Sequence, residues 1–485
     1  MKQQDLSAER GFKRRLTPKQ WMKLIIAVTL FLAWVIWMQS PIWLLLLPVL
    51  VDMYYTQFIP WTFWKKSSNP VFRKVMEWVD AIVFALLAVY FINTFFFQNY
   101  QIPTSSLEKS LLVGDYLFVS KMSYGPRIPM TPLSFPLAQH TMPIIGTKSY
   151  IDKPQIPYRR LKGFGNVERN QIVVFNYPAG DTVALNYPNQ DYYTLAYYNG
   201  GSEKIRRNPS LYGKVVYRPV DRRENYVKRC IGMPGDSLQI IDNQVYIDGK
   251  ALKNPEKMQL EYYIETNGTR FGERNWEELE INIADREMDN GRYNIPVGNG
   301  QTMPFLEFLG FTPKADGTFN PIYVLPLTAE KLEIVKKMPI VKKVVARPGL
   351  LSGEAYPLGY NMKWTFSNYG PIFIPKKGST IELNDSNYAL YNRCMINYEG
   401  NHVAKKGNQY YVNGEPATTY TFQMDYYWMM GDNRDNSADS RSWGFVPEDH
   451  IIGRPIFVWM SLEKDKSLFN GGIRFNRLFL NAKNL

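Results

Sequence analysis

The sequence has few residues of the two types that most often bind metal ions or supply a catalytic base. Only three histidines (His140, His402 and His450) and two cysteines (Cys230 and Cys394) occur in 485 residues. Two cysteines so far apart provide neither a zinc-ligand spacing nor a disulfide framework. The sequence therefore implies no metal and no cofactor, and it leaves little material for imidazole chemistry.

Acidic residues are also a minority, with 44 Asp and Glu against 57 Lys and Arg and a formal net charge of +13. Such an excess is typical of nucleic-acid-binding surfaces or of the basic residues that flank membrane spans. No stripe of basic residues interleaved with aromatic residues is present, so we expect no nucleic-acid partner. The content of 45% hydrophobic and 21% charged residues excludes a disordered chain.

Long apolar runs are confined to the start of the sequence, where three candidate membrane spans occur at 21–38, 42–59 and 79–97. The first and third approach the roughly 20 residues that cross about 30 Å of hydrocarbon. Pro48 and Asp52 interrupt the second. The first run is too long for a cleaved signal peptide. The alternative is a hairpin buried in the core of a soluble protein.

Basic clusters at 13–19 and 65–74 flank these runs. The positive-inside rule places both clusters in the cytoplasm. An even number of crossings must then separate the clusters, which favours a span at 42–59 despite its interruptions. We therefore expect three transmembrane helices, membrane lipid as a partner, and every residue after Phe97 on the outer side.

The exported part is typical of strands and turns. Short β-branched or aromatic runs lie at 116–120, 171–175, 237–241 and 244–247. Two similar segments, 243–250 and 408–415, each contain Asp-Gly or Asn-Gly just after an apolar run, which favours a tight hairpin turn. A helix is predicted over 328–337, opened by a threonine cap.

A run of three hydroxyl side chains follows the third apolar segment. Pro103 fixes its own φ and favours an extended Ile102, so the backbone near 100–104 can present a binding edge. Thr104, Ser105 and Ser106 follow. By itself, such a cluster is more typical of a turn or a helix cap.

Two further segments carry polar side chains in unusual settings. Residues 226–231 predict a strand in which Lys228 has mostly apolar neighbours, and burial there would lower its pKa. Alone, a solvent-facing strand lysine is the commoner outcome. Residues 430–445 are dense in Asp, Asn, Ser and Arg and first suggest a calcium loop. Ser437 and Trp443 stand where an EF-hand needs Gly and Glu, so that interpretation fails.

Together these segments resemble the boxes of type I bacterial signal peptidases, a family of serine–lysine proteases. That family carries Ile-Pro-Ser-x-Ser-Met after its anchor, then Tyr-Ile-Lys-Arg-x-x-Gly-x-Pro-Gly-Asp, then Gly-Asp-Asn-Arg-Asn/Asp-x-Ser-x-Asp-Ser-Arg. The sequence is similar to all three in the same order, and residues 172–175 resemble a fourth box. It departs in the first box, where Thr104 replaces Ser, Leu107 replaces Met, and Lys109-Ser110 replaces the usual Pro-Thr.

The resemblance implies a role for each matching residue. Ser106 would be the nucleophile and Lys228 the general base, and the Thr104 hydroxyl with the Ser106 amide would form the oxyanion hole. Residues of the third box would orient or support the lysine: Ser437, Asp439, Arg441 and Gly431. Small apolar pockets would be lined by Tyr100, Ile102, Leu107, Leu117, Val174 and Val227.

The resemblance also implies a fold class and a location. We expect a membrane-anchored, mainly-β protein with a signal-peptidase-like catalytic domain and a large inserted lobe. The predicted domains are an anchor at 1–98, a catalytic domain at 99–253 plus 408–461, an inserted lobe at 254–407 and a tail at 462–485. The location would be the bacterial inner membrane, multi-pass, with the catalytic domain on the periplasmic side. The partners would be secretory preproteins with small residues at the first and third positions before the cut, near the Sec translocon.

Three other functions compete with this interpretation. A Ser–His–Asp hydrolase would need His450, which has no G-x-S-x-G partner. A penicillin-binding-type acyltransferase would pair Ser106 with Lys109 as S-x-x-K, but the sequence has no K-T-G tripeptide. A non-catalytic binding module on the same fold would not be expected to retain both Ser106 and Lys228.

Overall fold

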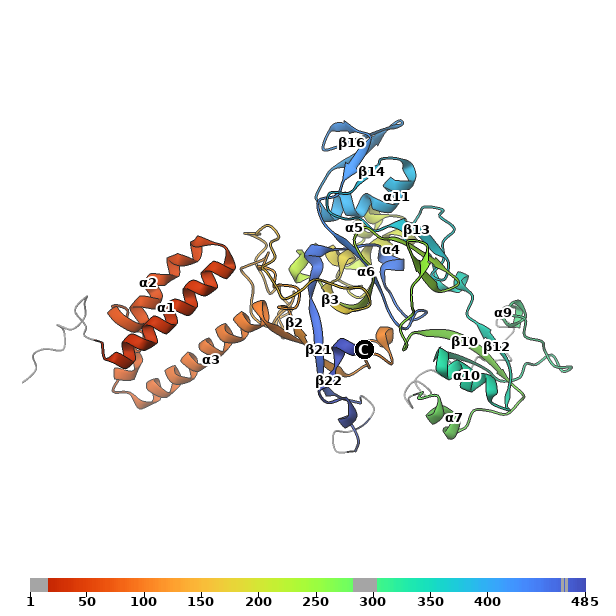
Figure 1. Ribbon diagram of the computed structural model, residues 1–485, viewed down its shortest axis with the longest axis horizontal. Helices are drawn as coiled ribbons and strands as arrows, with labels where there is room; N and C mark the ends of the chain where they lie inside the picture. The colour runs from red at the N-terminus through yellow and green to blue at the C-terminus, as the bar shows by residue number, and fades with distance from the viewer. Residues whose placement is uncertain (1–15, 282–302, 464–465, 467–469) are drawn as a thin grey trace, which may run out of the picture.

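The computed structural model describes residues 16–281, 303–463, 466 and 470–485. Figure 1 shows a group of helices at one end of the molecule, a β-rich body in the middle, and two further lobes beyond it. Part of the basic cluster predicted at 13–19 lies outside the described residues.

Two helices in the described part of the chain are long and apolar enough to cross a membrane. Helix α1 is Pro18–Met38 and helix α3 is Pro70–Phe95. Thr17 caps α1 through a capping box with Gln20, and Asn69 caps α3 by accepting from the first free amides. These helices contain most of the spans predicted at 21–38 and 79–97.

The segment between them forms a shorter apolar helix, Pro41–Thr56, than the predicted span at 42–59. It starts as a 3₁₀ helix (Pro41–Leu46), continues as α2 (Leu47–Val51) and ends as a π-helix (Asp52–Thr56). Sixteen residues in an α-helix would extend about 24 Å, less than the hydrocarbon thickness. The described residues therefore contain two apolar helices of full spanning length and, between them, one shorter apolar helix.

Asp52 closes this short helix instead of leaving a charge exposed in it. Its carboxylate accepts hydrogen bonds from the Phe58 amide at 2.7 Å, the Ile59 amide at 3.2 Å and the Trp61 indole at 2.9 Å. The acid thus satisfies amides beyond the helix end, which explains its presence in an apolar run.

The short helix packs antiparallel to α1. Trp34 near the end of α1 lies 5.1 Å from Trp43, and Trp21 near its start lies 6.0 Å from Tyr55, both between ring centroids. Trp37 lies 6.1 Å from Phe95, so α1 and α3 finish side by side. Figure 1 shows these two helix ends meeting the β-rich body.

The central sheet follows the order β1-β2-β21-β3-β6-β19-β20, with β22 paired to β21. Its strands are β1 (Phe97–Gln101), β2 (Asp115–Ser120), β3 (Ile172–Asn176), β6 (Asn225–Gly232), β19 (Tyr426–Met430), β20 (Val446–Pro447), β21 (Ile451–Ser461) and β22 (Leu480–Asn481). Strand β1 is at the edge and begins two residues after α3 ends. The membrane helix therefore leads directly into the sheet that carries the site.

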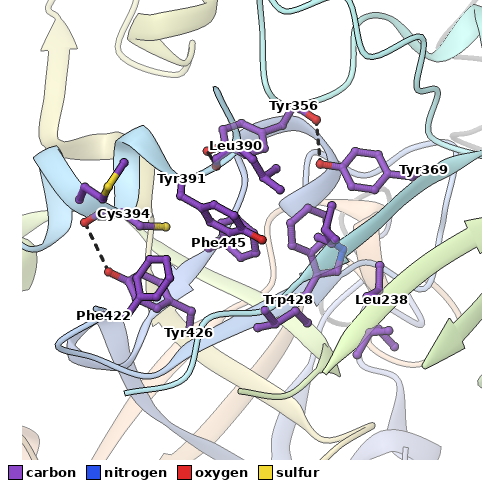
Figure 2. Close-up of a cluster of buried hydrophobic side chains, with 14 of the residues drawn as sticks. Leu238, Tyr356, Tyr369, Leu390, Tyr391, Cys394, Phe422, Tyr426, Trp428 and Phe445 are labelled. Carbon is purple, nitrogen blue, oxygen red and sulfur yellow. Dashed lines mark hydrogen bonds between the residues drawn. The ribbon is translucent and has the colours of Figure 1, made fainter. Parts of the chain in front are cut away.

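A second β-layer packs against this sheet. It contains β7 (Ser237–Ile241), β8 (Gln244–Ile247), β9 (Lys250–Ala251) and β13 (Tyr369–Phe373), and nearby are β14 (Thr380–Glu382), β15 (Val403–Lys406), β16 (Gln409–Val412), β17 (Glu415–Ala417), β18 (Thr419–Thr421) and α11 (Asp385–Arg393). Figure 2 shows the aromatic core between them, in which Trp428 and Phe445 are fully buried and the Tyr369 hydroxyl donates to the Tyr356 carbonyl at 2.7 Å.

A separate three-stranded sheet lies beyond the central body, in the order β11-β10-β12. Its strands are β10 (Gln259–Thr266), β11 (Ile322–Thr328) and β12 (Val341–Ala346), accompanied by α7 (Glu273–Glu278), α9 (Met303–Phe308) and α10 (Ala329–Lys337). The remaining short elements are β4 (Thr182–Ala184), β5 (Val215–Tyr217), α4 (Tyr192–Tyr198), α5 (Ser202–Arg207), α6 (Pro209–Tyr212) and α12 (Ser440–Trp443).

The segment expected as one inserted lobe, 254–407, is divided between these two regions. Strands between 259 and 346 form the three-stranded sheet, whereas β13 pairs with β7 and residues 390–403 contribute to the core of Figure 2. The apolar side chains of β13 and α11 complete the core around β7, and the sequence pattern alone did not show that pairing.

The local predictions agree with the structure. Strands occur over the four predicted runs, and both Asp248-Gly249 and Asn413-Gly414 adopt positive φ in hairpin turns. Thr328 caps α10 by accepting from the Lys331 amide at 3.3 Å. Cys230 and Cys394 are both free and buried.

Candidate active site

Ser106 lies in a single 3₁₀ turn, Ser105–Leu107, between β1 and β2. Pro103 and extended Thr104 precede the turn, and the Glu108 amide closes it on the Ser105 carbonyl at 3.0 Å. Leu107 and Leu111 are buried beneath it. The apolar residues thus fix the turn to the sheet and leave Ser106 only 7% exposed.

Lys228 lies on β6, opposite Val173 of β3, and is only 4% exposed. Its Nζ and the Ser106 hydroxyl are hydrogen-bonded, although 122 residues separate them in sequence. Burial lowers the pKa of Lys228 from its usual 10.5 to about 8, with Arg441 assisting and Asp439 and Asp432 opposing. The predicted nucleophile and base are therefore in direct contact.

The third box forms a loop that begins where β19 ends. The Gly431 amide donates to Asp439 at 3.0 Å, and the Arg441 guanidinium donates to both oxygens of the same carboxylate at 2.9 and 2.8 Å. Asp439 and Arg441 are fully buried, and this bidentate pair lowers the pKa of the Asp439 carboxyl against its desolvation. Asp439 thus bonds both the start of the loop, at Gly431, and Arg441 two residues further on.

This loop is also bonded to the turn that carries the nucleophile. The Asn433 amide donates to the Ser106 carbonyl at 3.1 Å, and the Asn436 side chain donates to the Ser105 hydroxyl at 3.0 Å. Neither asparagine stands out in the sequence by itself, although both belong to the third box. Their position two and five residues after Gly431 was the available signal.

A second buried network, also unassigned by the sequence analysis, supports the same turn. The Arg229 guanidinium donates to both oxygens of Asp432 at 2.8 and 2.6 Å, and the Ser110 hydroxyl donates to Asp432 at 2.7 Å. Arg229 directly follows Lys228 on β6. The three boxes are thus held together by charged hydrogen bonds within a few residues of the reactive pair.

The structure differs from the expectation at Ser437. Its hydroxyl is buried and makes no hydrogen bond within the described residues, so it does not hold the Lys228 amine in this structure. It lies against Gly431, where an added Cβ would be 2.3 Å from Ser437 Oγ and 2.6 Å from the Ser106 carbonyl oxygen. Gly431 therefore permits the close approach of the two loops.

The expected oxyanion donors come from the 3₁₀ turn and from the residue before it. Thr104 is exposed and its side chain does not cap the 3₁₀ turn. Its hydroxyl precedes the Ser106 amide by two residues.

The six predicted pocket residues belong to one apolar cluster beside Ser106. Ile102, Leu107, Leu117 and Val174 are in its buried part, and Tyr100 and Val227 pack against it partly exposed. They come from β1, the turn, β2, β3 and β6. The structure thus brings together every residue predicted for the pocket.

The rival bases are directed elsewhere. Lys109 Nζ donates to the Glu280 carbonyl at 2.8 Å and pairs with its carboxylate at 3.2 Å. His450 is buried between Asp449 at 2.5 Å and Arg223 at 2.7 Å. Since Lys228 occupies the hydrogen-bonding position beside Ser106, neither the S-x-x-K pairing nor an imidazole base fits this geometry.

A model of the family "Signal peptidase, peptidase S26" matches residues 75–301 and 374–460. The chain belongs to this signal peptidase family. Among its relatives, Signal peptidase I of Buchnera aphidicola subsp. Acyrthosiphon pisum is 24% identical over 394 residues, which is 81% of this chain and 77% of the relative. Signal peptidase I of Haemophilus influenzae is 23% identical over 423 residues, 86% and 79% of the two chains. That of Pseudomonas aeruginosa is 20% identical over 408 residues, 82% and 75%.

Membership of this family makes the chain a serine endopeptidase that removes signal peptides. The matched residues include all three boxes, with Ser106, Lys228 and Asp439 among them. Residues 302–373, which include β11 and β12, fall outside the match.

Proposed function

We propose that Ser106 and Lys228 form the catalytic dyad of this signal peptidase. The observation that carries the proposal is the hydrogen bond between the Lys228 amine and the Ser106 hydroxyl inside a buried site. With a pKa of about 8, roughly one lysine in ten is neutral at pH 7, against about one in 3,000 at 10.5. Burial thus makes the base available near neutral pH.

The reaction follows from this arrangement. The neutral Lys228 amine takes the hydroxyl proton as Ser106 Oγ attacks the scissile carbonyl, and the ammonium then protonates the departing amine. Water hydrolyses the resulting ester by the same proton path, releasing the signal peptide and restoring Ser106. The Ser106 amide and the Thr104 hydroxyl stabilise the negative oxygen in both halves.

The apolar cluster is proposed to select the residues before the cut. Ile102, Leu107 and Val227 are the proposed walls of pockets that take small side chains, such as alanine at the first and third positions before the cut. The free edge of β1 supports an extended substrate, because β1 pairs on one side only, with β2.

The third box is proposed to hold the base in register. Asp439, Arg441 and Gly431 fix the loop, and the buried Ser437 hydroxyl, which has no partner in the described residues, is available to the Lys228 amine after a rotation about χ1. Retention of this hydroxyl in a buried place supports an orienting role.

The catalytic domain is proposed to face the outer side of a bacterial inner membrane, as a multi-pass protein acting near the Sec translocon. The antiparallel packing of Pro41–Thr56 on α1 and the adjacent ends of α1 and α3 support three crossings. The Arg159 guanidinium also donates to the Met38 carbonyl at 3.0 Å, which ties the domain to the end of α1.

Cleavage of a purified preprotein tests this function. We expect the full chain to cut after alanine and to fail when leucine replaces that alanine, since overfilling the pocket would force the strands apart. Equal cleavage after leucine and alanine would contradict the proposed specificity while leaving the dyad intact. No cleavage of either preprotein by the wild-type chain would contradict the function.

A further inference from the structure

A cavity of about 640 Å³ lies between the last turns of α3, β1 and the loop after β2. Val89, Tyr90, Asn93 and Thr94 form its α3 wall. These residues extend roughly 7.5 Å along the helix axis and end one residue before the helix does. The cavity therefore runs from the apolar part of α3 to the level of the exported domain.

Positive charge dominates the opposite wall. Lys121, Arg127 and Arg222 line the cavity with a single carboxylate, Asp221. The Asp221 carboxylate already accepts from the Thr131 amide at 2.9 Å and hydroxyl at 2.7 Å, and it lies 3.9 Å from Arg222 Nε. One carboxylate so engaged does not neutralise three cations.

The two guanidiniums donate to neutral acceptors. Arg127 donates to the Asn176 side-chain oxygen at 2.6 Å and to the Asp449 carbonyl, and Arg222 donates to the Ser134 hydroxyl at 2.8 Å. The Asp449 carboxylate itself is bonded to His450. Both guanidiniums thus keep their positive charge without a bidentate carboxylate partner.

Lys121 shows the consequence of this crowding. Desolvation, together with Arg127 and Arg222, lowers the pKa of Lys121 to about 7, and Asp221 opposes the shift only in part. A phosphate in the cavity would accept from these cations and remove their mutual repulsion. The cavity therefore has the chemistry of an anion site.

Two exposed apolar side chains also line the cavity. Phe135 and Leu137 line it and are 46% and 70% exposed, and Ile144 and Ile145 are also exposed nearby in sequence. Ile128 and Leu161 tie this region to Met38 and Phe95 at the ends of α1 and α3. Figure 1 shows the loops that follow β2 on the side of the body that faces these helices.

We propose that this cavity binds the phosphate of an anionic phospholipid, with an acyl chain lying along Val89 and Tyr90. Lys121, Arg127 and Arg222 hold the headgroup, and the exposed Phe135 and Leu137 side chains enter the leaflet that contains this lipid. The inference depends on α3 crossing the bilayer, and it is independent of the roles of Ser106 and Lys228. A phospholipid matches both halves of the cavity, whereas a free anion would use only the cationic half.

The test uses the full chain purified in dodecyl maltoside and mixed with equal amounts of phosphatidylglycerol and phosphatidylcholine, with bound lipid measured by native mass spectrometry. We expect selective retention of phosphatidylglycerol. The double variant Lys121→Gln/Arg222→Gln should retain at least about tenfold less. Lys148→Gln, which removes an exposed lysine in the same region that pairs with Asp152, should behave as wild type.

Further readouts test whether the double variant is folded and whether the bound anion is a lipid headgroup or free phosphate. The double variant should still cleave a short soluble peptide, which would show that its active site is intact. The single variant Lys121→Arg, which keeps a cation at this position, should retain phosphatidylglycerol as the wild type does. Undiminished phosphatidylglycerol retention by the double variant would overturn the proposal. So would displacement of the lipid by millimolar inorganic phosphate, which indicates a free-anion site. A raised KM for preprotein with unchanged lipid retention would make the cavity a substrate subsite and would equally overturn it.

Discussion

The Lys228 amine contacts the Ser106 hydroxyl while both side chains are more than nine-tenths buried. The two residues come from different elements, Lys228 from β6 and Ser106 from the turn before β2. In the sheet, β3 and β21 lie between β6 and β2. The contact therefore depends on the pairing of the strands between them and on the loop from Gly431 to Arg441, which is bonded to the turn that carries Ser106. This dependence gives the following expectations.

The pH dependence should report the buried lysine. Only the neutral amine accepts the proton, so kcat/KM should rise about tenfold per pH unit below the Lys228 pKa of about 8 and level off above it. Initial rates on a preprotein between pH 6 and 10 measure this limb. A rise in kcat/KM centred on the usual lysine pKa of 10.5 would show that burial does not lower the pKa of Lys228.

Removal of the Thr104 hydroxyl should slow the chemistry without unfolding the protein. Thr104→Val should lower kcat by about 10²–10³, because one oxyanion donor is lost, whereas Thr104→Ser should retain most activity. Single-turnover cleavage distinguishes this from weaker binding. Wild-type kcat in Thr104→Val would exclude the hydroxyl from the oxyanion hole.

A methyl group at residue 431 should separate the two loops. Gly431→Ala places a Cβ 2.3 Å from Ser437 Oγ and 2.6 Å from the Ser106 carbonyl oxygen, so the turn must shift, at a cost of about 10² in kcat/KM. Gly165→Ala is the matched control, since its new Cβ would meet only one atom, at 3.7 Å. Equal activity of the two variants would show that the loops tolerate the separation.

Accessibility of single cysteines should reveal the number of crossings. With Cys230 and Cys394 buried, an impermeant thiol label applied to intact cells should modify a cysteine at Gly201 but not one at Ser68. Both positions are exposed, so protection of Ser68→Cys reports the membrane rather than the fold. Labelling at Ser68 would show that Pro41–Thr56 does not cross.

Local chemistry is what the sequence predicted well. The pairs Asp248-Gly249 and Asn413-Gly414 determine their turns within a few residues, and Thr328 determines the start of α10. Ser106 and Lys228 could be proposed as a pair from the sequence because their boxes are short and distinctive.

Long-range pairing is what the sequence could not supply. The Arg229–Asp432–Ser110 network joins three boxes across more than 300 residues, and its geometry depends on the register between β6 and β19. Strand β13, which begins at Tyr369, pairs with β7, although the strands of the three-stranded sheet lie between them in sequence. Because the sequence does not show this pairing, residues 254–407 resembled one lobe. That the Ser437 hydroxyl has no hydrogen-bond partner among the described residues depends on its rotamer, which no sequence pattern specifies.

Lys228, and not another cation near the turn, is the proposed base for Ser106. The most direct measurement is the preprotein cleavage rate of Lys228→Ala beside Lys109→Ala, with Ser106→Ala as the reference for loss of the nucleophile. We expect the cleavage rates of Lys228→Ala and Ser106→Ala to be about 10⁴–10⁶ lower than that of the wild type, because the loss of either member of a catalytic unit disables the unit. Lys109→Ala should keep most activity. Loss of cleavage in Lys109→Ala with substantial activity in Lys228→Ala would contradict the account.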